Sequence, residues 1–149
     1  MIDIVQRRIS DEWENAQPLF DAHWEETERW WQGTDHDIPK EKYDALEEAG
    51  RVVYLQLVHD DTLIGHVGAI ISESWHTQEM FAEEDIFFVL EEWRGKGLGS
   101  LLLQRLEEVL SGNGVSQLRY TTKEANAVGE KVALSRGYDL QGKLWTKRI

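Results

Sequence analysis

Residues 85–103, DIFFVLEEWRGKGLGSLLL, join an apolar strand to an apolar helix through a basic, glycine-rich turn. Glycine lets the backbone approach a ligand without obstruction by side chains. The first amides of the following helix have no partner within it and carry the positive end of its dipole. Arg94 and Lys96 add positive charge. The segment therefore predicts a phosphate-binding turn, with glycines at Gly95, Gly97 and Gly99.

Other phosphate-binding motifs fit this turn poorly. A P-loop has Lys followed by Ser or Thr after its last glycine, whereas Leu98 follows Gly97 and no Lys precedes Ser100. A dinucleotide fingerprint follows the first strand of its domain, whereas this turn lies past the middle of the chain. The remaining pattern, Arg-x-x-Gly-x-Gly from Arg94, resembles the pyrophosphate-binding motif of the GNAT superfamily of acyl-CoA-dependent N-acyltransferases.

The order of the predicted elements resembles that superfamily along nearly the whole chain. Apolar periodicity and breaker residues predict strands at 2–8, 52–59, 63–71, 85–90 and 115–122, helices at 10–31, 39–48, 97–111 and 125–136, and a terminal hairpin at 138–149. The resemblance implies a single α/β domain spanning residues 1–149. Its mixed, mostly antiparallel sheet would have about six to seven strands, flanked by about four helices and splayed at the motif strand.

Composition excludes several other classes of protein. No apolar run approaches the ~20 residues of a membrane span, and the charged start of the chain is not a secretory signal, so we expect a cytoplasmic protein with no membrane partner. The chain has no Cys, which excludes a thiolate metal site and a cysteine nucleophile and favours direct attack by the acceptor. Its five His show no metal-ligand spacing, so no metal is expected.

The charge of the chain is acidic and uneven. A net charge of −12 argues against binding to a nucleic-acid backbone. Residues 11–48 hold 13 acidic residues against three basic ones, a local net charge of −10. The resemblance places this segment beside the acceptor, where its field would attract a cationic amine. The alternative interpretation is a solvated acidic face that keeps the protein soluble.

The resemblance implies acetyl-CoA as cosubstrate. The backbone of Phe87, Phe88 and Val89 would bind the pantetheine arm as an added strand, provided that this strand separates from the strand at 115–122. Asn126 would contact the same arm. The turn residues that would bind the pyrophosphate are Arg94, Gly95, Lys96, Gly97, Leu98, Gly99 and Ser100.

The acceptor amine loses a proton as it attacks the thioester, so a base is required nearby. Glu83 stands 11 residues before Arg94, where histone acetyltransferases of the superfamily carry their base. Asp85 is two residues nearer to the cofactor. Side chains alternate along a strand, so Glu83, Asp85 and Phe87 are expected on one face.

A branch of the superfamily common in bacteriophages and prophages resembles this chain still more closely. Its first helix carries His-Trp-Glu-Glu, a His precedes the motif strand, and an Asp lies within it. The matching residues here are His23-Trp24-Glu25-Glu26, His76 and Asp85. Trp24 and Glu26 are candidate substrate contacts, although Trp24 also lies on the apolar stripe of the helix and fits the core.

Asp85 is therefore the leading candidate for a polar group of the active site. His23 and His76 are candidates for the base or for orienting the acceptor, and Glu83 is the rival base. Many relatives place a Tyr on the last helix to protonate the departing thiolate. Matching Asn126 and Gly137 to the Asn and the terminal Gly of the family puts Ala133 at that position. Ser135 is a weak substitute for the Tyr hydroxyl. Because the CoA thiol has a pKa of about 8.5, its thiolate is a good leaving group, and water could protonate it.

Three functions fit these observations. The first is an N-acetyltransferase that moves an acetyl group from acetyl-CoA to a primary amine in a ternary complex. The second is a non-catalytic CoA-binding protein on the same fold. The third is a host-protein-interaction module that uses the acidic, Trp-rich flank, including Trp30 and Trp31. The resemblance also allows a homodimer formed through terminal strands.

Overall fold

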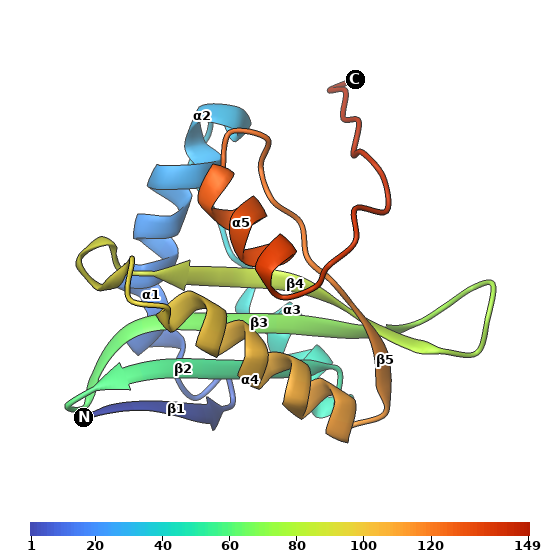
Figure 1. Ribbon diagram of the computed structural model, residues 1–149. Helices are drawn as coiled ribbons and strands as arrows, with labels where there is room; N and C mark the ends of the chain where they lie inside the picture. Colours follow the sequence, from blue (N-terminus) through green and yellow to red (C-terminus); the bar gives the residue numbers. More distant parts are fainter.

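The computed structural model describes residues 1–149. Its centre is a single sheet with the strand order β1-β2-β3-β4-β5 (Figure 1). Strands β1 to β4 pair antiparallel, and β5 runs parallel to β4, which confirms the predicted mixed, mostly antiparallel sheet. The strands are β1 (Ile2–Arg7), β2 (Val52–His59), β3 (Thr62–Glu73), β4 (Met80–Val89) and β5 (Val115–Arg119).

Helices cover both faces of this sheet. In Figure 1, α4 (Leu98–Gly112) and α5 (Ala127–Ser135) lie in front of it, and α1 (Trp13–His23) and α3 (Lys40–Glu48) lie behind it. Two apolar cores result, one beneath α4 and one beneath α1. None of these helices is long and apolar enough to cross a membrane.

Strand β2 shows how the sequence builds both cores. Leu55 belongs to the core beneath α4, and its neighbour Tyr54 belongs to the core beneath α1. Successive side chains of a strand point to opposite faces, so a strand covered on both sides is apolar at nearly every position. Leu102 and Leu106 of α4 are fully buried. Each contributes about 1.5–3 kcal/mol relative to an exposed side chain.

The first predicted helix is interrupted where it faces the motif strand. We expected one helix over residues 10–31. Instead α1 passes into a π-helical turn, η1 (Trp24–Glu28), and then into the short α2 (Arg29–Gln32). The Thr27 hydroxyl donates to the His23 carbonyl oxygen at 2.9 Å. Such a bond competes with the regular backbone ladder and distorts a helix.

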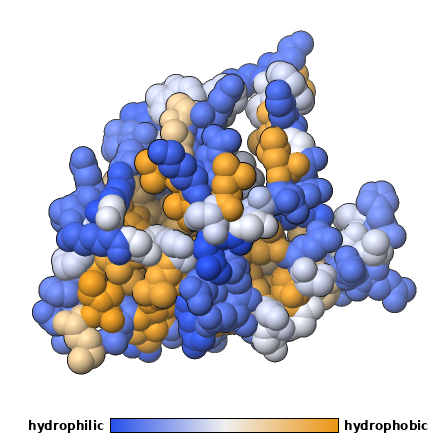
Figure 2. Space-filling model, in the orientation of Figure 1, coloured by the Kyte–Doolittle hydropathy of each residue, from blue (hydrophilic) through white to orange (hydrophobic).

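The predicted terminal hairpin is not formed, and the sheet has five strands instead of about six to seven. After α5 ends near Gly137, the chain runs away from the sheet, and residues 138–149 form no strand (Figure 1). β5 is only five residues long and pairs with only the first part of β4, so it offers a short edge for a further strand. Apolar side chains of this segment are exposed, among them Leu140, Leu144 and Trp145. Figure 2 shows orange, apolar groups exposed among polar ones on this face of the molecule.

Candidate active site

Strands β4 and β5 separate part of the way along β4. Their pairing runs from Met80↔Val115 to Glu83↔Arg119 and stops there. Residues 84–89 remain paired with β3 on one side and have no strand on the other. Figure 1 shows the chain after β5 diverging from β4 towards α5. The backbone of β4 is therefore available to an extended ligand, as the sequence predicted.

The glycine-rich turn joins this edge to α4 through a short 3-10 helix, η2 (Glu91–Trp93). Gly95 and Gly97 have φ values of +74° and +77°, which side chains disfavour, and a Cβ at either position would meet nothing within 4 Å. Gly97 begins α4 without a side-chain cap, and the first helical bond joins the Leu101 amide to its carbonyl oxygen at 3.0 Å. The amides of residues 98–100 are thus free to bind an anion.

The two cations of the turn are already engaged. Arg94 binds Glu26 of η1 through two hydrogen bonds, at 2.7 and 2.8 Å, and its Nε donates to the Val89 carbonyl oxygen at 2.7 Å. Lys96 Nζ lies 4.7 Å from the centroid of the Trp93 ring and donates to the Glu92 carbonyl oxygen at 3.2 Å. Backbone amides therefore form the open part of this site.

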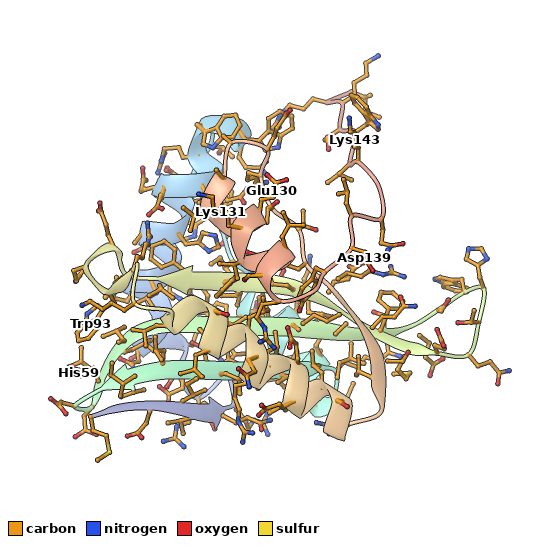
Figure 3. The ribbon with its side chains drawn as sticks, viewed as in Figure 1. His59, Trp93, Glu130, Lys131, Asp139 and Lys143 are labelled. Atoms are coloured by element: carbon orange, nitrogen blue, oxygen red, sulfur yellow. The ribbon has the colours of Figure 1, made fainter.

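Trp93 fixes the outer side of the turn. Its ring packs against His59 with centroids 4.6 Å apart, and Figure 3 shows the two side chains together at this edge. Lys96 covers the same ring. The stack holds the turn between β2 and α4, so its amides keep one orientation.

On the opposite face of β4, α1 and α3 approach Asp85. The Tyr43 hydroxyl donates a hydrogen bond to the Asp85 carboxylate. His23 stacks on Phe88 with centroids 5.2 Å apart. Burial lowers the pKa of His23, although the carboxylates of Glu28, Glu26 and Asp85 partly oppose this. The lowered pKa favours the neutral form of the His23 imidazole.

The structure brings the predicted polar residues together only in part. Glu83 is exposed and pairs with Arg119 at 3.4 Å. His76 lies in the exposed turn between β3 and β4, beyond Met80. Met80 is five residues from Asp85, about 16 Å along a strand, so His76 is not brought to the cleft.

Trp24 and Glu26 both contact protein groups. The Trp24 indole donates to the Thr34 carbonyl oxygen at 3.0 Å and stacks on His36 with centroids 5.4 Å apart. These contacts favour a structural role for Trp24. Glu26 holds Arg94.

Comparison with known proteins agrees with this geometry. The profile of the acetyltransferase (GNAT) family matches residues 16–138. The chain belongs to the GNAT family. No curated protein matches it.

Solved GNAT structures share the fold over the full chain. An aminoglycoside acetyltransferase from an uncultured soil metagenomic sample, in complex with sisomicin, has a TM-score of 0.79 at 13% identity, covering 99% of this chain and 95% of that one. A ribosomal-protein-alanine N-acetyltransferase from Brucella melitensis biovar Abortus 2308 has a TM-score of 0.76 at 17% identity, covering 100% and 99%. An aminoglycoside N-acetyltransferase in complex with CoA has a TM-score of 0.75 at 18% identity, covering 100% and 95%.

The sequence did not single out Glu84 of this GNAT chain. The register of β3 and β4 shifts between Gly68 and Ala69, so β4 carries one extra residue at Glu84 and Asp85. Such a bulge breaks the alternation of side chains. Asp85 therefore faces Tyr43 behind the sheet, while Phe87 lies 3.5 Å from the Cβ position of Gly99 in front, and the predicted shared face is wrong.

Glu84 is the first β4 residue beyond the last β4–β5 pair. Burial raises the pKa of its carboxyl to about 8, and the charges of Asp85 and Glu28 add to the rise. Lys123 and the Thr121 amide oppose it. A carboxyl group that titrates near neutral pH inside a cleft is a candidate acid or base.

Asn126 has a structural task in this GNAT fold. Its Oδ1 accepts a hydrogen bond from the Gly129 amide at 2.9 Å and caps α5. The cap fixes α5 over the opening between β4 and β5. Only its Nδ2 is left for a cofactor contact.

Proposed function

We propose that this GNAT protein transfers the acetyl group of acetyl-CoA to a primary amine by direct attack in a ternary complex. One observation carries the proposal. The unpaired edge of β4, residues 84–89, leads through η2 and the glycine-rich turn to the free amides at the start of α4. An extended pantetheine arm would bind the edge, and its pyrophosphate would bind the amides.

The acceptor would enter from the side of α1 and η1. Its nitrogen attacks the carbonyl carbon of the thioester, the C–N bond forms, and a proton passes from nitrogen to a base. We assign the base to Glu84, because it lies where the strands part and its pKa of about 8 is matched to a proton transfer near neutral pH. Asp85, held by Tyr43, and the neutral His23 would orient the amine.

The charges around the cleft favour a cationic acceptor. Glu26, Glu28 and Asp85 all act on the pKa of His23, so their carboxylates surround the same space. The nearby cation Lys123 is paired with Glu28 at 3.3 Å. Lys123 and Arg94 thereby neutralise Glu28 and Glu26, so the net negative charge on this side comes from Asp85, and a polyamine or aminosugar would be attracted to it.

The test is release of CoA from acetyl-CoA, followed with a thiol reagent. The acceptors are sisomicin, spermidine and a neutral peptide that begins with alanine. We expect faster release with the two polycations, at a KM at least tenfold lower than that of the peptide. The acyltransferase assignment would be wrong if the protein bound acetyl-CoA and none of a broad set of primary amines increased CoA release.

Binding of acetyl-CoA without amine-dependent CoA release would favour the non-catalytic CoA-binding alternative.

We place the working protein in the cytoplasm, where acetyl-CoA is available to a transferase. The resemblance to the phage branch rests on the motif at residues 23–26, on His76 and on Asp85, and it stays a prediction.

A further inference from the structure

Cleavage of the thioester leaves a CoA thiolate that must take up a proton, and a tyrosine hydroxyl near the point where β4 and β5 part is free to supply it. The chain has four tyrosines. Three of their hydroxyls have hydrogen-bond partners: Tyr43 with Asp85, Tyr54 with His66 and Tyr138 with Glu107. The hydroxyl of Tyr120 has none. The Ser135 hydroxyl donates to the Val132 carbonyl oxygen of its own helix at 2.9 Å, so it is not available either.

Tyr120 lies where β4 and β5 part. The last pair between the strands is Glu83↔Arg119, so Tyr120 and Glu84 are the first residues beyond it. A pantetheine arm that runs from the turn along the β4 edge has its pyrophosphate at α4 and its sulfur at the far end. That end is the point of separation, beside Tyr120.

The ring of Tyr120 is held by its neighbours. It packs edge-to-face against Phe87 at 5.7 Å and against Tyr138 at 5.9 Å between centroids. Phe87 in turn lies against Gly99 at the start of α4. Tyr120 is half-buried. The ring is thus fixed relative to both ends of the cofactor path.

We propose that Tyr120 is the proton donor to the departing CoA sulfur, an inference that rests on the proposed acetyl transfer. As the C–S bond breaks, its electron pair stays on sulfur, and the Tyr120 O–H proton moves to it to give CoA-SH. The phenolate then takes the proton that Glu84 received from the amine. One proton thus passes from the amine nitrogen to the CoA sulfur, and Tyr120 and Glu84 return to their starting states.

The pKa values of Tyr120 and Glu84 suit this order of proton transfers. Burial, together with the charge of Glu84, raises the pKa of Tyr120 to about 12. The hydroxyl therefore keeps its proton until the thiolate forms. Glu84 and Tyr120 directly follow the last pair of these neighbouring strands, which places the two groups near each other.

The test compares Tyr120→Phe with Tyr138→Phe. Both variants lose one hydroxyl from the same pair of stacked rings, but the Tyr138 hydroxyl is bound to Glu107 at 2.9 Å. The first measurement needs no acceptor. The pKa of the thiol in protein-bound CoA is read from thiolate absorbance, with desulfo-CoA as the blank. A hydroxyl that donates to sulfur stabilises the thiolate, so Tyr120→Phe should raise this pKa by about one unit and Tyr138→Phe should leave it unchanged.

The second measurement is turnover with the best amine acceptor. Tyr120→Phe should lower kcat by about tenfold or more while the Kd of acetyl-CoA changes less than about twofold. An unchanged thiol pKa in folded, CoA-binding Tyr120→Phe, or turnover within about threefold of wild type, would overturn the assignment. Failure of the wild type to bind acetyl-CoA would instead remove the proposed function itself.

Discussion

At the scale of single residues, two carboxylates next to each other in sequence have different environments. The Asp85 carboxylate accepts a hydrogen bond from Tyr43 behind the sheet. Glu84 lies at the opening between β4 and β5, and burial raises the pKa of its carboxyl to about 8. One extra residue in β4 produces this division, because it turns neighbouring side chains towards different partners.

Glu84→Gln should lower kcat by about 100-fold, because the base is lost, with little change in acetyl-CoA affinity. The wild-type rate should rise with pH through about 8, as Glu84 ionises, and this rise should be absent in the variant. Steady-state kinetics from pH 6 to 9 check both. If Asp85→Asn abolished the pH-dependent rise and Glu84→Gln did not, the base would be Asp85.

The same variant should gain stability at alkaline pH. A carboxyl whose folded pKa is raised stabilises the native state while it is protonated, and this contribution is lost as pH rises through the folded value. Wild type should therefore lose stability from about pH 4.5 to pH 8, and Glu84→Gln should lose less. Thermal unfolding at pH 5 and pH 8.5 measures this. An equal fall in Tm for both proteins would argue against burial as the cause of the raised pKa.

Glu26→Gln should strengthen CoA binding about two- to fivefold. The substitution removes a carboxylate beside the pyrophosphate site and frees the Arg94 guanidinium. Glu25→Gln is the control, because Glu25 pairs with Arg29 and does not contact the turn. Weaker CoA binding in Glu26→Gln would show that the pair holds Arg94 in its working position.

At the scale of elements, the proposed cofactor site depends on the start of α4. Gly97 begins this helix at φ +77°, and Gly114 follows its end at φ +80°. Nothing lies within 4 Å of a Cβ at either position. The two glycines therefore match in backbone strain and differ in their distance from the cofactor path.

Gly97→Ala should weaken acetyl-CoA binding at least tenfold, because its methyl group and the strained φ disturb the amides of residues 98–100. Gly97→Ala and Gly114→Ala should lower Tm by similar amounts, since both substitutions force an alanine to a positive φ at a cost of about 1 kcal/mol. The acetyl-CoA affinity of Gly114→Ala should be unchanged. Equal affinities in the two variants would mean that the turn does not bind the cofactor.

The sequence predicted individual helices and turns better than the pairing of one strand with another. The glycine-rich turn and α4 depend on local signals, and both lie where the pattern placed them. The bulge at Asp85, next to Glu84, was missed, because it arises from the pairing of β3 with β4 and has no local signature. The terminal hairpin was wrong for a related reason, since residues 138–149 have the pattern of strands but a hairpin also needs a sheet edge to join.

At the scale of the whole molecule, the charge is acidic, and residues 11–48 alone carry a net charge of −10. The net charge is −12, and carboxylates of η1 and β4 surround His23. Two cations lie near these carboxylates. Arg94 is paired with Glu26, and Lys123 is paired with Glu28. A field of this kind acts over a distance comparable to the Debye length.

The KM of a polycationic acceptor should therefore rise about fivefold or more between 50 mM and 300 mM salt, with little change in kcat, because salt screens the attraction. A neutral peptide acceptor is the control and should show a flat KM. Salt-independent kinetics for the polycation would favour the alternative interpretation of a solvated acidic face.

The most direct test of the central claim is isothermal titration of the protein with acetyl-CoA. We predict binding with one site per chain that is weakened at least tenfold in Gly97→Ala and retained in Gly114→Ala. Absence of binding to the wild type, or equal binding to all three proteins, would contradict a cofactor site formed by the β4 edge and the α4 amides.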